Sequence, residues 1–354
     1  MAPSATRDLS SGLSADREQV VADPPDLSHW SENLFFTMYD PAADLGLWAH
    51  LGTYPTDWTM WEDWVMVTLP GDGGMLSTRG YHRTPPERRP AGSNLAFECV
   101  EPFRRWRITF DGRCLLTPYD ELQRRRVSEG VRYPLAFDLA AECVTPVWDS
   151  HTSASSASGR GSIRGQSWAT DHYQQLLRLT GTVHLPDGAV TFDGVGWRDH
   201  SRGPRYGPTG ARWGGHAILS GLFPSGRAFG LSRMWAPDGT VTLDAGYMVD
   251  GEGTLHHAEV LEVPRLRDIQ LAGEPIPMAL RSAAGEVALT GETLKSTWIT
   301  RNHGIAPGLD LTGEASILAE AYARWEWDGE VGYGLCERSE HLHDIPDVRC
   351  APQE

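Results

Sequence analysis

Recurrent turn signals are the feature of this sequence that most limits its fold. Asp-Gly pairs begin at residues 72, 111, 187, 193, 238, 250 and 328. Asp followed by Gly suits the positive φ angles of tight hairpin turns. In Pro186-Asp187-Gly188 and Pro237-Asp238-Gly239, a proline also pre-sets the first angle of the turn. The turn pattern therefore favours hairpins and an antiparallel arrangement.

Between the turns lie strand-length runs of β-branched and aromatic residues bounded by Gly or Pro. These runs are Trp64–Leu69, Trp106–Phe110, Val190–Val195, His216–Leu222, Ala228–Trp235 and Tyr322–Trp327. Few windows keep a helical period, and the best are Asp40–His50, Asp120–Arg126 and Leu318–Ala323. We expect an all-β protein with few short helices.

The length of 354 residues predicts about two domains. Residues 1–27 are rich in Ser, Ala, Asp and Pro, and we expect a disordered N-terminal arm there. We place one β domain at 28–185, a second at 186–346 and a tail at 347–354. The Ser/Gly/Arg-rich segment 150–167 is expected to be a loop.

The composition disfavours several classes of partner and compartment. The formal charge of −16 argues against nucleic acid, because binding a phosphate backbone requires clustered cations. Apolar runs such as Val65–Leu69 are too short to span a bilayer, so we expect no stable membrane insertion. The five cysteines include no C-x-x-C pair, and the first residues lack a basic, apolar, small-residue pattern, so we expect no secretory signal. These features are typical of a reduced, cytoplasmic protein.

Motifs for nucleotide and metal cofactors are missing from the sequence. There is no phosphate-binding loop, Gly194-Val195-Gly196 lacks the third glycine of a dinucleotide fingerprint, and neither G-x-S-x-G nor H-E-x-x-H occurs. The acidic and histidine residues near the C-terminus are interpreted as a charged tail, since their spacing matches no compact metal site. They are Glu337, Glu340, His341, His343 and Asp344. We therefore expect no cofactor and no metal.

The segment 194–205 carries the strongest functional signal. It places five charged or titratable residues beside Trp197, namely Arg198, Asp199, His200, Arg202 and Arg205. Buried charges must be paired, so this segment predicts an internal ion-pair network, although the same pairs could only clamp the rim of a barrel. In a regular strand, Val195, Trp197 and Asp199 share one face, opposite Arg198 and His200. A bulge at Gly194 or Gly196 would invert this assignment.

Flanking strands add candidate residues on both sides of this segment. His172 and Tyr173 precede it, and they could transfer protons or satisfy each other in a core. Trp213 and His216 follow it, on opposite faces of an expected strand, where a histidine can also be structural.

At these residues the sequence resembles a known family. The run G-x-G-x-R-D-H-S-x-G-P-R at 194–205, the preceding H-Y-x-Q at 172–175 and the segment Trp327–Glu337 are similar to the lipocalin-like superfamily of carotenoid 1,2-hydratase. AttH-like proteins, kievitone hydratase and several β-barrel pericyclases belong to that superfamily. The resemblance spans roughly residues 30–340 and is strongest at D-H-S. The chain departs from the family in having Arg202 where Trp is common and Gln174 where Glu is common.

The resemblance implies two lipocalin-like antiparallel β-barrels side by side, with a site for a hydrophobic small molecule in or between them. It also implies cofactor-independent acid–base chemistry on terpenoid or prenylated substrates. Hydrating an alkene or dehydrating a tertiary alcohol passes through a carbocation-like state, which needs a proton donor and aromatic faces.

Our hypothesis is a cofactor-free hydratase or dehydratase, or an isomerase, of a terpenoid-type substrate. Asp199 is the expected proton donor, although it could instead hold His200 as a charged donor or anchor an arginine. The catalytic candidates are Asp199, His200, His172 and Tyr173, and the substrate-binding candidates are Trp197, Arg198, Arg202, Trp213, His216 and Trp235. A non-catalytic carrier of a lipophilic ligand and a cyclase or pericyclase acting on a polyene remain alternatives, as does a homo-oligomer.

Overall fold

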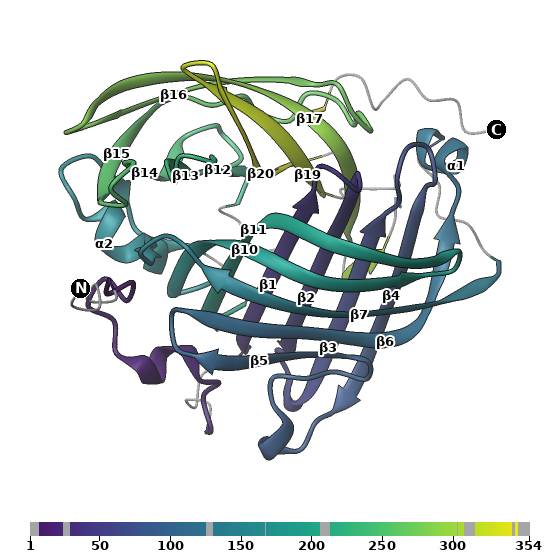
Figure 1. Ribbon diagram of the computed structural model, residues 1–354. Helices are drawn as coiled ribbons and strands as arrows, with labels where there is room; N and C mark the ends of the chain where they lie inside the picture. Colours follow the sequence, from purple (N-terminus) through teal and green to yellow (C-terminus); the bar gives the residue numbers. More distant parts are fainter. Residues whose placement is uncertain are drawn as a thin grey trace, which may run out of the picture.

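The computed structural model describes residues 7–23, 29–124, 130–166, 168–205, 213–302, 304–307, 316–341 and 344–345. Two antiparallel β-barrels lie side by side, one from the earlier and one from the later part of the chain (Figure 1). Each contains a closed ring of eight strands, so the expectation of an all-β, two-barrel architecture with few helices is confirmed.

The first barrel closes where β11 pairs with both β10 and β1. Its ring follows the order β1 (Trp30–Asp40), β2 (Leu45–Tyr54), β3 (Asp57–Thr68), β4 (Met75–Arg83), β6 (Arg105–Thr117), β7 (Arg132–Cys143), β10 (Asp171–Leu185) and β11 (Gly188–Pro204). Two further strands extend it, since β5 (Leu95–Glu101) pairs with β6 and β8 (Trp148–Asp149) pairs with β10.

The second barrel closes where β12 pairs with both β13 and β20. Its ring follows the order β12 (Gly215–Leu222), β13 (Ala228–Trp235), β14 (Val241–Val249), β15 (Leu255–Glu262), β16 (Pro275–Ser282), β17 (Gly285–Asn302), β19 (Ser316–Trp327) and β20 (Glu330–His341). β18 (Gly304–Pro307) pairs with β17, and β9 (Arg160–Gly161) reaches across to pair with β14.

The helices among the described residues are short. They are α1 (Tyr119–Gln123), α2 (Ser150–Ala154) and the 3-10 turns η1 (Ala15–Glu18), η2 (Pro86–Arg88) and η3 (Ile163–Gly165). The prediction of a helix at Asp120–Arg126 is confirmed by α1 as far as Gln123, and its last two residues lie outside the described residues. The predictions of helices at Asp40–His50 and Leu318–Ala323 are wrong. The first window spans the end of β1, the turn at 41–44 and part of β2, and the second lies within β19. The sequence pattern is misleading there because β2 and β19 are buried on both faces, which removes the polar alternation that marks a strand.

The Ser/Gly/Arg-rich segment is not the loop that its composition predicts. Asp149 caps α2, its carboxylate accepting hydrogen bonds from the backbone N–H groups of His151 at 3.3 Å and Thr152 at 3.1 Å. Ser150 and Ser153 are buried, and Ser153 Oγ donates to the carbonyl oxygen of Gly246 in the second barrel. The segment therefore packs between the two barrels.

The division of the chain differs from the expected one. The first barrel continues to Pro204, because the β10–β11 hairpin closes it, so the two rings divide between residues 204 and 215 rather than at 185. Part of the expected disordered arm is also ordered, since η1 inserts Glu18 into the first barrel, where it is 2 % exposed. An ion pair with Arg198 holds it there. The tail at 347–354 lies outside the described residues.

The buried apolar side chains form several clusters. Two of these clusters fill the barrel interiors, and another covers the surface where the barrels meet. In the first barrel, residues such as Phe36 and Leu177 point inward, while Phe35, Trp48 and Trp197 point outward toward the second barrel. We call this outward surface of β1, β2, β3, β10 and β11 the inter-barrel face of the first barrel. No helix among the described residues is long and apolar enough to cross a membrane.

The outer surface of β12, β13, β14 and β20 forms the opposing wall. β20 lies against β11 and β1, and β12 lies against β10 and β11. The rings of Tyr39 and Tyr322 stack across the boundary with their centroids 5.3 Å apart, and Lys295 forms a 3.0 Å ion pair with Asp44. These contacts fix which strands face each other, and so define what can line a site between the barrels.

Candidate functional site

Strand alternation separates the predicted catalytic residues onto two surfaces. β10 and β11 pair without a register shift, so the bulge considered at the glycines does not occur. Trp197 therefore joins Asp199 on the inter-barrel face, and Arg198 joins His200 inside the first barrel. In the same way, His172 lies outside and Tyr173 inside. The predicted split of this segment between two faces is confirmed.

A hydrogen-bonded chain of three side chains lies on the inter-barrel face. Ser150 Oγ is 2.6 Å from His172 Nδ1, and His172 Nε2 is 3.0 Å from Asp199 Oδ2. Ser150 and His172 are buried, whereas the Asp199 side chain keeps 13 % of its surface exposed. If the serine hydroxyl donates to Nδ1, Nε2–H is left to donate to the carboxylate. The histidine thus orients a carboxylate whose other oxygen can act on a bound molecule.

The neighbours of Asp199 form a mixed apolar and polar surface. Asp199 lies directly between Gln174 on β10 and Phe35 on β1. The ring of Phe35 contacts those of Trp48 and Trp197 at centroid distances of 5.0 and 5.5 Å. Apolar aromatic side chains therefore surround one side of the carboxylate.

Gln174 connects this surface with the second barrel. Its Oε1 accepts a 3.0 Å hydrogen bond from Trp197 Nε1, and its Nε2 donates to Ser232 Oγ on β13 at 3.4 Å. Gln174, which stands where the superfamily that the sequence resembles commonly has glutamate, is thus completely buried, and both ends of its amide are hydrogen-bonded. It holds Trp197 in place between the two barrels.

Trp168 bridges His172 and the second barrel as well. Its ring meets the imidazole edge-on at a centroid distance of 5.0 Å, and its Nε1–H points at the sulfur of Met234, 3.3 Å away. Met234 is paired with His216 across β13 and β12. The opposing wall next to His172 therefore carries His216.

His216 belongs to a second hydrogen-bonded chain on that wall. Its Nε2 is 2.5 Å from a carboxylate oxygen of Glu337, and its Nδ1 is 2.7 Å from Ser339 Oγ. Trp213 precedes β12 and is therefore not subject to strand alternation. Its ring contacts the His216 imidazole at 5.8 Å, so the expectation that the two lie on opposite faces is wrong.

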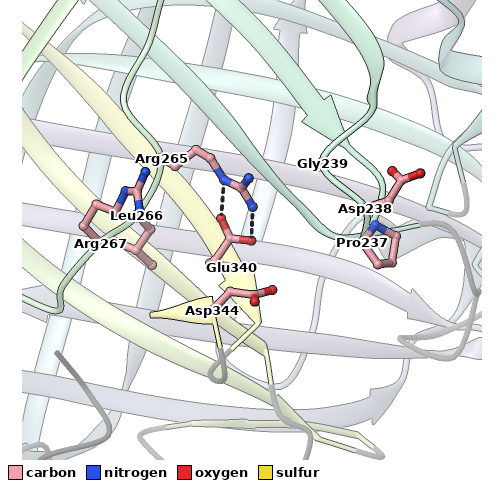
Figure 2. Close-up of a pocket in the computed structure, with 8 residues that line it drawn as sticks. All are labelled: Pro237, Asp238, Gly239, Arg265, Leu266, Arg267, Glu340 and Asp344. Carbon is pink, nitrogen blue, oxygen red and sulfur yellow. Dashed lines mark hydrogen bonds and ion pairs between the residues drawn. The ribbon is translucent and has the colours of Figure 1, made fainter. Parts of the chain in front are cut away.

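Trp235 lies away from the inter-barrel face, in the apolar interior of the second barrel. Its Nε1 donates to Glu340 at 3.2 Å, and the guanidinium of Arg265 lies 4.7 Å from its ring centroid. A pocket of about 260 Å³ opens beside these residues, lined mainly by charged and turn residues (Figure 2). Because Arg265 and Glu340 pair across it at 2.7 Å, this pocket does not resemble an apolar ligand site.

The remaining predicted residues form a polar network inside the first barrel. Arg198 is completely buried and pairs with Glu18 at 2.9 Å, and it also donates to Gln175. Burial alone would raise the pKa of Glu18, but the charge and hydrogen bond of Arg198, together with His200 and the backbone N–H of Phe103, hold that pKa below its usual value. Arg198 therefore neutralises a buried carboxylate and does not contact the inter-barrel face.

His200 and Arg202 share a second buried carboxylate. His200 Nε2 lies 2.7 Å from Glu32, and Arg202 Nε donates to the same oxygen at 2.6 Å. Tyr173 Oη lies 2.7 Å from His200 Nδ1 and 2.9 Å from Glu18. Burial lowers the pKa of His200 and raises that of Tyr173 well above its usual value. These groups link the N-terminal segment to β1, β10 and β11.

Several residues that complete these networks escaped the sequence analysis. Ser150, Glu18 and Glu32 are distant in sequence from the D-H-S motif, and no spacing rule connects them to it. Glu337 was interpreted as part of a charged tail, yet it lies inside β20 and is 8 % exposed. Its position in a strand-forming, glycine-flanked run could have signalled burial.

Among the described residues, no group of three or more His, Cys, Asp or Glu side chains could hold a metal ion. The four cysteines in the described part of the chain, Cys99, Cys114, Cys143 and Cys336, are free. Cys350 and His343 lie outside the described residues.

Comparison with known proteins gives a family and a shared fold. A family model described as "Domain of unknown function (DUF7064)" matches residues 16–342. A protein assigned as AttH from Nitrosomonas europaea is similar in structure, with 13% sequence identity, a TM-score of 0.52 and coverage of 89% of this chain and 93% of that one. Kievitone hydratase from Nectria haematococca gives 11% identity, a TM-score of 0.50 and 88% coverage of both chains. No curated protein sequence matches at a significant level.

These likenesses support the lipocalin-like fold, as the sequence resemblance implied. They provide no evidence for a carotenoid hydratase in particular.

Proposed function

The chain belongs to the family described as a domain of unknown function (DUF7064), and from the geometry of its inter-barrel face we propose that it is a hydratase or dehydratase of a hydrophobic, terpenoid or prenylated small molecule. The observation that carries the proposal is the Ser150–His172–Asp199 chain beside Trp197 and Phe35. A hydratase among the proteins that share the fold supports the same reaction class.

Asp199 is the proton-transfer group in this proposal. In hydration, its protonated carboxyl gives a proton to an alkene carbon, and water then attacks the cationic carbon. In dehydration, the carboxylic acid protonates the leaving hydroxyl, water departs, and a base removes a proton from the adjacent carbon. His172 holds one oxygen of the carboxyl, so the other oxygen keeps a fixed direction toward the substrate.

The aromatic residues stabilise the cationic intermediate. The face of an aromatic ring attracts a nearby positive charge by about 0.5–2 kcal/mol. Trp197 is fixed by its hydrogen bond to Gln174, and Phe35 by its contacts with Trp48 and Trp197. A fixed ring loses no further entropy when the cation forms, which favours the transition state over the bound alkene.

Gln174 and Arg202, the two departures from the pattern of the carotenoid 1,2-hydratase superfamily, affect this proposal differently. Gln174 cannot donate a proton as a carboxylic acid would, and its amide is occupied by Trp197 and Ser232, so it acts as a positioning residue. Arg202 pairs with Glu32 inside the first barrel, so this arginine does not make the inter-barrel face more polar. The substrate is therefore still expected to be hydrophobic.

The proposal is tested by incubating the protein with 2-prenylphenol, geraniol and linalool in ¹⁸O-labelled water. Mass spectrometry then detects added water in the first two products and lost water in the third. Asp199→Asn should reduce turnover about 10²- to 10⁴-fold, as expected for loss of a general acid. Asp193→Asn is the matched control, because Asp193 lies on the same strand and is exposed.

The outcome separates the proposal from its alternatives. A lipophilic-ligand carrier would bind these compounds, detected by quenching of tryptophan fluorescence, and leave their masses unchanged. A cyclase would convert a polyene without incorporating ¹⁸O. If the protein hydrates the probe and Asp199→Asn is as active as wild type, the proposed role of Asp199 is wrong although the reaction class stands.

A further inference from the structure

The two barrels carry the same eight-residue pattern on corresponding strands. β11 contains Gly194-Val-Gly-Trp-Arg-Asp-His-Ser201, and β20 contains Gly332-Tyr-Gly-Leu-Cys-Glu-Arg-Ser339. Both have the form G-x-G-x-x-acid-base-S, with Glu337 at the position of Asp199. Each strand is the last of its ring and pairs with the first strand of that ring, which closes the barrel.

The glycines of the two patterns do the same structural work. A Cβ at any of them would collide with a backbone oxygen of the closing strand: Tyr39 and Thr37 of β1 for Gly194 and Gly196, and Leu222 and Ser220 of β12 for Gly332 and Gly334. Glycine at these positions lets the last strand approach the first one closely. The pattern is therefore a structural repeat rather than a chance similarity of letters.

The residues after the glycines also correspond. The basic residue of each pattern points into its own barrel, where His200 pairs with Glu32 and Arg338 with Glu274. The acidic residue points outward and meets a histidine, at 3.0 Å between Asp199 and His172 and at 2.5 Å between Glu337 and His216. Each of the two facing walls therefore carries a histidine–carboxylate pair.

Each of these histidines is also bound by a serine. In the second barrel, Ser339 Oγ accepts the backbone N–H of His216 at 3.0 Å, so its hydroxyl proton is available for Nδ1 at 2.7 Å. His216 Nε2–H then donates to Glu337, just as His172 does to Asp199 in the first barrel. This arrangement orients Glu337 as a carboxylate that accepts protons.

The two carboxylates lie on strands that face each other. β20 packs against β11 and β1, and Gln174 beside Asp199 is bonded to Ser232, which pairs with Ile218. Ile218 in turn pairs with Glu337. Glu320 of β19 is the cross-strand neighbour of Glu337 on the same wall. Asp199 and Glu337 therefore lie on the two opposing walls of the boundary between the barrels.

We propose that Glu337, oriented by His216 and Ser339, is the second proton-transfer residue of this site and acts on the wall opposite Asp199. The inference rests on the proposed hydratase function. In hydration, the Asp199 carboxyl protonates the alkene, the water oxygen bonds to the resulting cation, and Glu337 accepts the proton that this oxygen loses. Asp199 then regains a proton from solvent and Glu337 releases one, so each turnover adds one water to one alkene.

The test compares Glu337→Gln with wild type in the turnover of 2-prenylphenol, with kcat/KM measured against pH. If the base must be ionised to act, kcat/KM falls as the pH drops below the pKa of that base, and this fall is the acid limb of the profile. We expect Glu337→Gln to lower kcat about 10²- to 10⁴-fold and to remove that acid limb. The Kd for 2-prenylphenol, measured by fluorescence quenching, should stay within about twofold, as for loss of a general base rather than of a binding contact.

Two further variants keep the inference falsifiable if Glu337→Gln folds poorly. Glu337→Asp keeps the charge, so it should retain the acid limb with reduced kcat. Glu326→Gln makes the same change at an exposed position of the neighbouring strand β19 and should match wild type. If Glu337→Gln retains wild-type kcat and both pH limbs, the inference is wrong while the role of Asp199 stands. If wild type adds no water to the probe, the proposed function itself fails.

Discussion

At the scale of single residues, neighbours in sequence perform separate tasks. Arg198 and Asp199 are adjacent, yet one closes a buried ion pair inside a barrel and the other projects from its outer surface. The period of two in a strand separates them completely. Substitutions at Arg198 or His200 therefore act on the stability of the first barrel, and those at Asp199 or His172 on events between the barrels.

Glu62 provides a residue-scale prediction about pH. Burial would raise the pKa of this carboxyl, but His50 and Arg79 lower it from 4.5 to about 2. A lowered carboxyl pKa stabilises the fold above the unfolded value of 4.5, and this contribution disappears as pH falls toward 2. The shift corresponds to roughly 3 kcal/mol at neutral pH.

We therefore expect Glu62→Gln to be less stable than wild type at pH 7, with a difference that shrinks below pH 4.5, in urea unfolding followed by tryptophan fluorescence. The control is Glu87→Gln in η2, where the side chain is exposed. A difference between wild type and Glu62→Gln that is independent of pH would contradict this explanation.

At the scale of elements, the short N-terminal turn η1 is part of the first barrel. It delivers Glu18, which accepts hydrogen bonds from Arg198 at 2.9 Å, from Trp106 at 3.1 Å and from the backbone N–H of Phe103 at 3.1 Å. One carboxylate thus satisfies donors from β6 and β11 and from the turn before β6. Without η1, which lies outside the ring of strands, the first barrel would hold Arg198 without a counter-ion.

We predict that Glu18→Gln destabilises the protein by about 3–5 kcal/mol, because it leaves the Arg198 charge buried without a counter-ion. Double substitution with Arg198→Met should recover a substantial part of this loss, since the double variant leaves no charge at position 198 without a counter-ion. Equilibrium unfolding measures both effects. Equal stability of Glu18→Gln and wild type would mean that solvent reaches Arg198.

At the scale of the whole molecule, the two barrels complete each other. The inter-barrel face of the first barrel carries Phe35, Trp48, Trp64 and Trp197, all at most 6 % exposed. Contiguous apolar surface of this kind is rare on a soluble monomer. The second barrel covers it, and that packing also brings the strands that carry Asp199 and Glu337 against each other.

The first barrel expressed alone, as residues 1–205, should therefore expose this face. We expect concentration-dependent association in analytical ultracentrifugation, stronger binding of an apolar dye than by the full chain, and no turnover. Replacing Trp48 and Trp64 by Gln in the same fragment should reduce the association. A monomeric fragment that binds no dye would contradict the idea that the barrels depend on each other.

The sequence by itself determined the class of fold and the alternation of the D-H-S segment between two faces, whereas the unbroken register of β10 and β11 decided that no bulge inverts that alternation. Asp-Gly turns at 72, 187, 238, 250 and 328 do separate strands, because their geometry is local. The pairs at 111 and 193 lie within β6 and β11 instead. In these two strands the glycine allows neighbouring groups to pack closely against the backbone, and a rule based on turn geometry does not detect that role.

Only the tertiary structure decided which residues share a site. His172 and Asp199 are 27 positions apart and Glu337 lies 121 positions from His216, and barrel closure brings each pair into contact. The repeated G-x-G-x-x-acid-base-S pattern is visible in the letters, yet its meaning depends on both strands closing a ring and facing each other. Turns and alternation are set by neighbours in the chain, whereas a site between two barrels is set by long-range packing, which no local pattern encodes.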